Sequence, residues 1–160
     1  MRTIADVDSK DRVDDSSVPQ QRLARILVVA HKTAATPLLL AAVRERAQRG
    51  SVEFHLLLPN PAEHAEISEG ERRRRHAEGE QMLALARPLI EEAAGGAVTG
   101  IVSLRHDPMD AIDEVLRAGG FDEIILSTLP HSVSRWLHLD LPRRVAHFGL
   151  PVTTITPDPR

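Results

Sequence analysis

Short aliphatic runs alternate with longer amphipathic segments along most of the chain. The clearest run, ILVVA at residues 26–30, contains no polar residue, which is typical of a strand buried on both faces of a sheet. Further runs predict strands at 52–58, 98–104, 124–126 and 152–155. Between the runs, apolar residues recur at the spacing of one helical face and glycines often follow them, so most connections are predicted to be helical.

Helix-start signals mark three of these connections. Thr36 and Asp107 are predicted N-caps, and the proline that follows each of them suits a first helical position, where no backbone N–H is needed. Asp140, with a proline two residues later, is predicted to begin the last helix, which ends near 148–149. Residues 127–139 are predicted to form a connecting loop with short helical turns.

The longest connection covers about residues 67–94. Pro88 lies inside its helical pattern, and we expect it to kink or interrupt the helix because proline cannot donate a backbone hydrogen bond. The run from Arg72 to Arg75 is surrounded by glutamates, so we interpret it as a solvated helix face with ion pairs. The predicted inward face of this helix consists of Leu83, Ala86, Leu89, Ile90 and Ala93.

Strands that alternate with helices predict parallel pairing through right-handed crossovers. The fold class is therefore α/β: a doubly wound, five-stranded parallel sheet with helices on both faces. Residues 23–157 are predicted to form this single domain, and the aspartate-rich residues 1–22 a disordered tail. Ligands of such sheets bind beyond the carboxyl ends of the strands, so the loops after 30, 58, 104 and 126 are the ones to inspect.

The composition excludes several classes of function. The 160 residues include no cysteine, which rules out disulfides, cysteine metal sites and thiol catalysis. A net charge of -3 and an aromatic content of 2% argue against a nucleic-acid partner, which needs positive charge and stacking surfaces. No apolar run reaches the length of a membrane-spanning helix, so we expect no membrane partner and a cytoplasmic location.

Several segments resemble the universal stress protein family in their order and local sequence. The resemblance covers Arg25 to Ile155. It implies a flavodoxin-like α/β fold with strand order 3-2-1-4-5, a role in the stress response, and commonly a homodimer with a nucleotide pocket. The segments that carry it are the opening strand at 26–30, Asp107-Pro108 before a helix, the strand region 121–126, and the ending RRVAHFGLPV at 143–152.

The resemblance stops at the phosphate loop. ATP-binding members of the family carry Gly-x2-Gly-x9-Gly-[Ser/Thr] after the fourth strand. Here the first glycine position holds Ser127, the second Pro130, and the third falls on Leu139 or Asp140. Pro130 has no N–H, and a carboxylate at Asp140 repels phosphate. The family's acidic residue at the end of the first strand is also replaced, by Ala30 or His31, so we do not expect standard ATP binding.

Polar residues in the loops at the ligand end of the sheet form a candidate site for a small molecule or anion. The alternative interpretation is that they are solvated loop side chains that cap nearby turns. Ser134 also belongs to the polar set of these loops. The candidate ligand-binding residues are Ala30, His31, Lys32, Thr33, His106, Asp107, Ser127, Thr128, His131, Ser132, Arg135 and Asp140.

The sequence does not require a catalytic centre, and we assign no catalytic or metal-binding residue. None of the eight histidines shows a metal-ligand spacing, and phosphate-binding and nucleophile motifs are absent. His31, His106 and His131 follow strands that end on the same side of the sheet, so a shared site remains an alternative. A second alternative is a nucleotide-binding stress protein or slow ATPase with an atypical phosphate loop.

Two further features concern partners. The final strand is predicted to lie at a sheet edge, where unpaired backbone groups favour a homodimer. Trp136, with Leu137, Leu139 and Leu141, forms an apolar patch that we interpret as packing, with a partner surface as the alternative.

Overall fold

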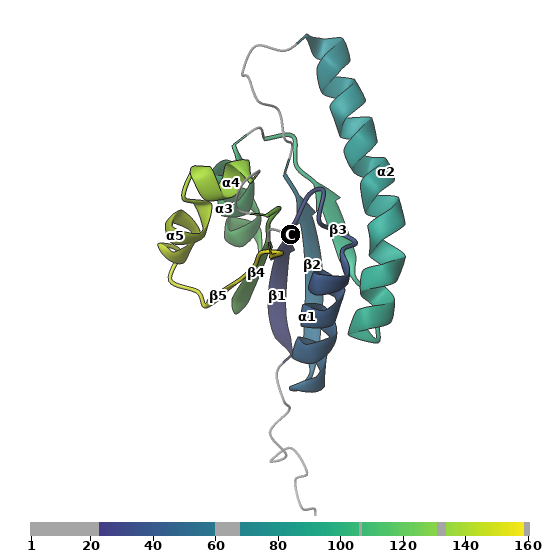
Figure 1. Cartoon of the computed structure of the whole chain (residues 1–160), viewed down its shortest axis with the longest axis vertical. Coiled ribbons are helices and arrows are strands. Elements are labelled where there is room, and N and C mark those ends of the chain that lie inside the picture. The colour runs from purple at the N-terminus through teal and green to yellow at the C-terminus, as the bar shows by residue number, and fades with distance from the viewer. Residues whose placement is uncertain (1–22, 60–67, 106, 131–133, 159–160) are drawn as a thin grey trace, which may run out of the picture.

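In the computed structural model, residues 23–59, 68–105, 107–130 and 134–158 are described, and the predicted tail at 1–22 lies outside them. Within these ranges five parallel strands form one sheet in the order β3-β2-β1-β4-β5 (Figure 1). The predicted α/β fold and strand order are therefore confirmed. The strands are β1 (Ala24–Val29), β2 (Val52–Leu58), β3 (Thr99–Val102), β4 (Glu123–Ser127) and β5 (Val152–Ile155).

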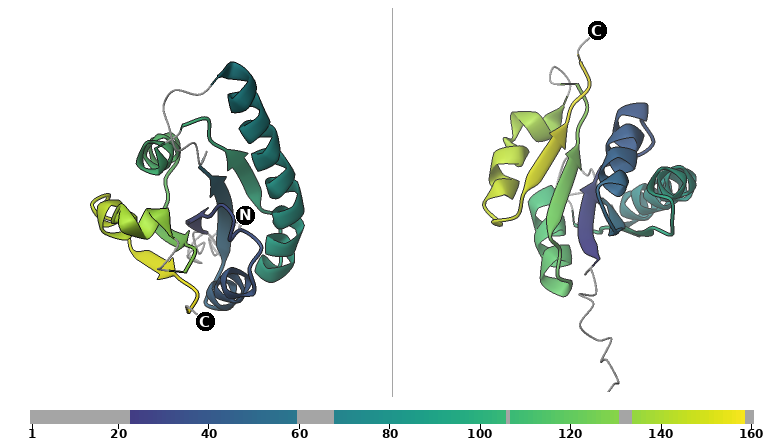
Figure 2. Two further views of the ribbon diagram at one scale, coloured as in Figure 1. Left: turned by 45° about the horizontal axis from the view of Figure 1, so that its top comes forward. Right: turned by 90° about the horizontal axis from the view of Figure 1, so that it is seen from below.

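The helices cover both faces of the sheet, as the right panel of Figure 2 shows. One face carries α1 (Pro37–Gln48) and α2 (Glu69–Ala94). The other carries α3 (Pro108–Ala118), the short α4 (Arg135–His138) and α5 (Leu141–Ala146).

Alternate residues of β1 supply the two core layers. Ile26 and Val28 pack beneath α1 and α2, whereas Leu27 and Val29 pack beneath α3 and α5. All four side chains are fully buried. This explains the uninterrupted apolar run: a central parallel strand has no solvent face, so no position along it favours a polar side chain.

Small residues bring α2 close to the edge strand β3. A Cβ atom on the buried Gly79 would lie 2.7 Å from Val102 Cγ1, and one on Gly100 would collide with Leu83. The N-terminal part of α2 extends beyond the end of the sheet (Figure 1). The position of this 26-residue helix is therefore set by close contact along β3.

The interruption of α2 expected at Pro88 and the inward position expected for Leu89 were wrong. Pro88 lies within a continuous helix and does not interrupt it. The proline is exposed, so water can satisfy the carbonyl that loses its helical partner. Leu89, expected on the inward face, is 41% exposed, while the other four predicted inward residues are buried.

Strand β3 is shorter than predicted. It ends at Val102, after which the Ser103 N–H donates to the Leu58 carbonyl at 2.9 Å. Leu104, expected at the end of the strand, is 66% exposed. Because Leu104 is apolar, the sequence pattern included it in the predicted strand. The strand itself ends earlier, where its hydrogen bonds to β2 end.

Among the described residues, no helix combines the length and apolar character needed to cross a membrane.

Candidate functional site

The loop after β1 is tied to the end of β4 by two buried hydroxyl groups. Thr33 Oγ1 donates to the Ser127 carbonyl at 3.1 Å, and Ser127 Oγ donates to Thr33 Oγ1 at 2.8 Å. The two residues are only 3% and 2% exposed. Because each hydroxyl has one proton to donate, this pair leaves neither proton for a ligand.

Thr128 is likewise engaged inside the protein. Its N–H donates to the Ile155 carbonyl at 2.9 Å, and its hydroxyl contacts Thr156 Oγ1 at 2.8 Å and the Leu129 carbonyl at 3.0 Å. These bonds fix the end of β4 to the end of β5. The backbone N–H and the hydroxyl of Thr128 are therefore both engaged within the protein.

His31 is a half-buried residue directly after β1. Burial lowers its pKa, the neighbouring Lys32 lowers it further, and Glu78 on α2 acts in the opposite direction. The imidazole therefore favours its neutral form more than an ordinary histidine does, which makes it a weaker partner for an anion. Lys32 is exposed, whereas Ala30 is fully buried and donates its N–H to the Leu57 carbonyl at 3.1 Å.

Asp107 caps α3 as predicted. Its Oδ1 atom accepts a hydrogen bond from the Met109 N–H at 2.9 Å. Pro108 follows and has no N–H to offer. The carboxylate thus occupies a donor that an external anion would need at this helix start.

Asp140 directly precedes α5, as predicted, and its side chain makes no capping hydrogen bond. Its backbone is left-handed, with φ 56° and ψ 37°, and no other non-glycine residue in the described ranges has a positive φ. The residue is exposed, and its Oδ2 atom lies 3.9 Å from Arg143 Nη1. A residue at one of the two positions assigned to the third family glycine therefore adopts a conformation that favours glycine.

The remaining predicted site residues divide into two groups. Arg135 is the exposed first residue of α4, and Ser134 caps that helix by accepting from the Leu137 N–H at 3.2 Å. His106, His131 and Ser132 lie outside the described residues, so the three-histidine alternative stays a prediction. In the part of the chain that is described, no three His, Cys, Asp or Glu side chains gather in a way that could hold a metal ion.

The apolar patch after β4 is split by the fold. Leu141 is fully buried, and Trp136 packs against the core layer beneath α3 and α5. Leu139 remains 44% exposed. Packing thus accounts for the tryptophan, as we interpreted it.

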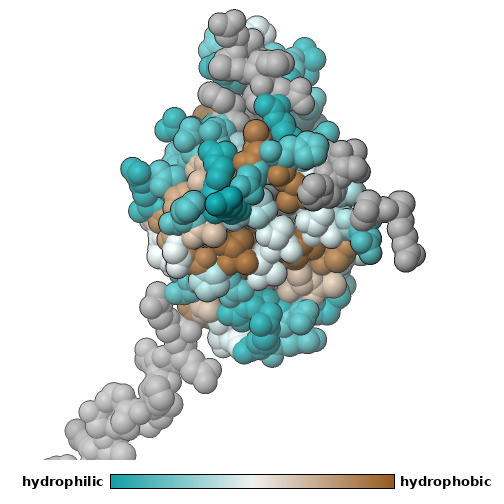
Figure 3. All heavy atoms as spheres, turned by 60° about the vertical axis from the view of Figure 1, so that its left-hand side comes forward, coloured by the Kyte–Doolittle hydropathy of each residue, from teal (hydrophilic) through white to brown (hydrophobic). Residues whose placement is uncertain are grey.

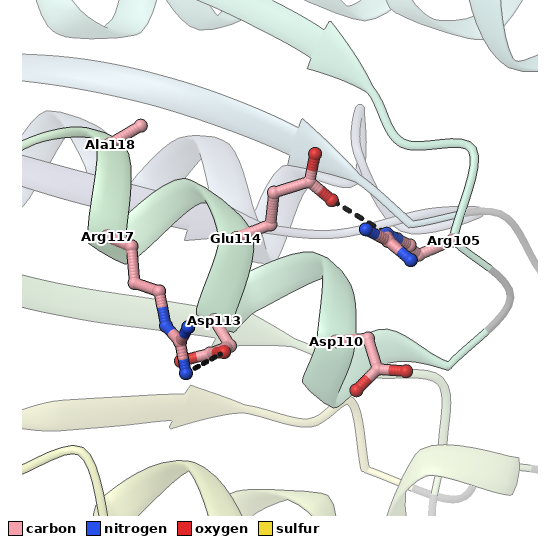
Figure 4. Close-up of a pocket in the computed structure, with 6 residues that line it drawn as sticks. All are labelled: Arg105, Asp110, Asp113, Glu114, Arg117 and Ala118. Atoms are coloured by element: carbon pink, nitrogen blue, oxygen red, sulfur yellow. Dashed lines mark hydrogen bonds and ion pairs between the residues drawn. The ribbon is translucent and has the colours of Figure 1, made fainter.

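A charged hollow of about 490 Å³, not expected from the sequence, lies beside α3. Figure 4 shows Arg105 reaching from the loop after β3 to Glu114, with Nε and Oε2 2.9 Å apart. Arg117 pairs with Asp113 at 3.0 Å. Both guanidinium groups are bound to carboxylates, so the hollow has no excess positive charge for an anion. Only the i,i+4 spacing of Asp113 and Arg117 was visible in the sequence.

No family model and no curated protein matches the chain. Solved structures do match. A universal stress protein from Archaeoglobus fulgidus aligns with a TM-score of 0.59 and 17% identity, covering 82% of this chain and 93% of that one. A Burkholderia pseudomallei protein of the universal stress protein family gives 0.58 and 17%, covering 86% and 98%.

The chain has the fold of the universal stress proteins. A third structure with this universal stress protein fold, from Archaeoglobus fulgidus in complex with dAMP, aligns with a TM-score of 0.52 and 14% identity. It covers 84% of this chain and 97% of that one. Nearly the whole length of each of these universal stress proteins is therefore represented here.

Proposed function

We propose that this protein is a divergent universal stress protein that acts as a regulatory or ligand-sensing module and does not bind ATP through a glycine loop. The proposal rests on the segment that runs from the end of β4 to the start of α5. There the Ser127 hydroxyl is closed onto Thr33, and the left-handed position at Asp140 holds a carboxylate.

The charge and the hydrogen-bond donors of this segment disfavour binding of a triphosphate. Phosphate oxygens need convergent N–H or O–H donors, and the Ser127 proton is already committed. Pro130 has no N–H. At Asp140, a negative charge stands where the left-handed backbone would otherwise suit a phosphate-binding glycine.

Isothermal calorimetry with Mg-ATP tests the proposal. The parent protein is expected to give no saturable heat at millimolar nucleotide, while Asp140→Ser and Asp140→Gly remove the repulsion and are expected to bind more tightly than the parent. Glu45→Gln, at an exposed position of α1, is the matched control for loss of one negative charge. Saturable heat in the parent would contradict the proposal.

A nucleotide sensor with an atypical loop is the second candidate. It is favoured by the dAMP complex of one structural neighbour, since a monophosphate needs fewer donors than a triphosphate. Titration with dAMP followed by amide chemical shifts discriminates between the two. Shifts concentrated at the amides of residues 30–33 and 127–129 would favour this candidate, whereas unchanged spectra would support the first candidate.

We further propose a homodimer through β5, which lies at one edge of the sheet. The Pro151 and Ile155 carbonyls accept from β4, so in a parallel ladder the backbone groups of Val152 and Thr154 point outward. Figure 3 looks onto the side that holds α4, α5 and β5 and shows apolar areas between polar ones. An open edge beside apolar surface suits a second copy of this chain.

Proline substitutions test the dimer. Thr154→Pro removes an outward N–H and is expected to give a folded monomer in light scattering, because no bond to β4 is lost. Thr153→Pro removes an inward N–H and is expected to destabilise the protein instead. An unchanged dimer in Thr154→Pro would place the interface elsewhere, and a parent protein that is monomeric would overturn the proposal.

A further inference from the structure

Five side chains meet on the sheet face opposite α1 and α2, away from the candidate ligand site. We call them the His55 cluster: Arg25 of β1, Glu53 and His55 of β2, Thr99 of β3, and Phe121 before β4. In the register of β2 and β3, His55 lies opposite Thr99 and Leu57 opposite Ile101. Thr99 is exposed and Ile101 is 52% exposed, so this part of the face is open to solvent.

Both ring nitrogens of His55 have partners. Nε2 lies 3.2 Å from Arg25 Nη2, and Nδ1 contacts Thr99 Oγ1. A guanidinium can only donate, so Nε2 must accept and the ring proton must be on Nδ1, where it donates to Thr99. A hydrogen bond from Arg25 to Nε2 therefore requires the neutral imidazole with its proton on Nδ1, whereas a protonated Nε2 would face Glu53 Oε1, 3.5 Å away.

Arg25 extends this connection to the turn after α3. Its Nη1 donates to the Gly120 carbonyl at 3.3 Å, and its guanidinium lies 4.7 Å from the centre of the Phe121 ring. The same ring meets the imidazole of His55 edge-on, with 5.1 Å between centroids. His55 thus links the edge strand β3 to β1 and to the segment that leads into β4.

We propose that His55 is an acid-sensitive latch, which in its neutral form holds β3 and the turn after α3 to the centre of the sheet and on protonation releases Arg25 and loosens that edge. A proton on Nε2 replaces the lone pair that accepts from Arg25. It also places an imidazolium 3.2 Å from a guanidinium.

The charged groups around the ring determine how strongly the latch responds. Arg25 on β1 opposes protonation, and Glu53 on β2, with Oε1 3.5 Å from Nε2, favours it. Asp122 before β4 accepts from the backbone N–H of Arg25, and the β3 member, Thr99, does not titrate. Burial is the largest influence on the pKa of His55 and, together with Arg25, lowers it despite Glu53.

The direction of the pH effect follows from this lowered pKa. The folded state prefers the neutral ring more than the unfolded state does, so the stabilisation is complete above about pH 6.5 and is lost as the pH falls through the folded-state pKa. For each unit by which the folded-state pKa lies below the unfolded value, the unfolding constant rises about tenfold at low pH.

Histidine NMR and urea unfolding test the latch in the parent protein. The His55 imidazole is expected to titrate below about 6.5, the ordinary value for histidine. Amides of Ile101 and Ser103, which face β2, are expected to lose exchange protection at about pH 5 relative to about pH 7.5, after correction for the intrinsic rate. A His55 midpoint at or above about 6.5 overturns the proposal.

Variants separate the latch from a merely structural contact. His55→Gln removes the titrating group, so its unfolding constant should change less with pH than that of the parent. His147→Gln, at an exposed position directly after α5, is the matched control for the substitution itself. Glu53→Gln, which retains His55, should move the His55 midpoint further down. Retention of the full parent pH dependence in His55→Gln, or an upward shift in Glu53→Gln, would count against the latch.

Discussion

Two aspartates precede helices on the same side of the sheet, and their backbones differ. Asp107 has an extended backbone, with φ -92° and ψ 120°, and its carboxylate accepts from the Met109 N–H. Asp140 is left-handed, and its carboxylate makes no capping bond. Both are followed by a proline within two residues, so the same sequence signal leads to different local structures.

The difference arises from what lies before each helix. Helix α3 follows a loop from β3, whereas α5 begins three residues after α4 ends. The Asp140 N–H donates to the Leu137 carbonyl at 3.1 Å, so the residue closes α4 while its own carbonyl accepts from Arg144 in the next helix. A left-handed residue makes the sharp turn between two such helices possible. Capping by an aspartate therefore requires an extended backbone at that residue as well as the right side chain.

Of the substitutions at these two aspartates, Asp107→Ala is expected to change the free energy of unfolding most. Loss of the bond to the Met109 N–H should reduce the free energy of unfolding by about 1 kcal/mol. Urea denaturation measures it, with Asp110→Ala in the first turn of α3 as the control. A loss no larger than in that control would show that the cap contributes nothing.

Asp140→Gly is expected to act in the opposite direction. Glycine removes the backbone strain of the left-handed conformation, which outweighs the greater conformational entropy that glycine gives the unfolded chain. The free energy of unfolding should therefore rise by about 0.5 kcal/mol. The same urea experiment measures the change. Destabilisation would mean that the Asp140 carboxylate has a structural role that its contacts do not reveal.

Asp140→Asn should have the smallest effect. Asparagine tolerates the left-handed region and removes only the charge, so the free energy of unfolding should stay within about 0.5 kcal/mol of the parent. Calorimetric titration of this variant with Mg-ATP then isolates the electrostatic contribution. If Asp140→Gly binds nucleotide and Asp140→Asn does not, backbone freedom rather than charge limits binding.

The predictability of the candidate site differed from residue to residue. The Asp107 cap was predicted because it depends on a local bond, two residues along the chain. The closure of Ser127 onto Thr33 joins residues 94 positions apart and leaves no local signal. The predicted ligand-binding roles of Lys32, Arg135 and the residues outside the described ranges stay predictions.

The sequence by itself determined the order of strands and helices, the parallel sheet and the two-faced burial of β1, because hydrophobic periodicity and helix-start signals act over a few residues. Only the tertiary structure decided which hydroxyl groups hydrogen-bond within the protein and which aspartate adopts a left-handed backbone. It also decided that His55 contacts Arg25 and Thr99, which are 30 and 44 positions away. Those outcomes depend on strand register and on helices that meet at a corner, and both are set by packing across the whole sheet.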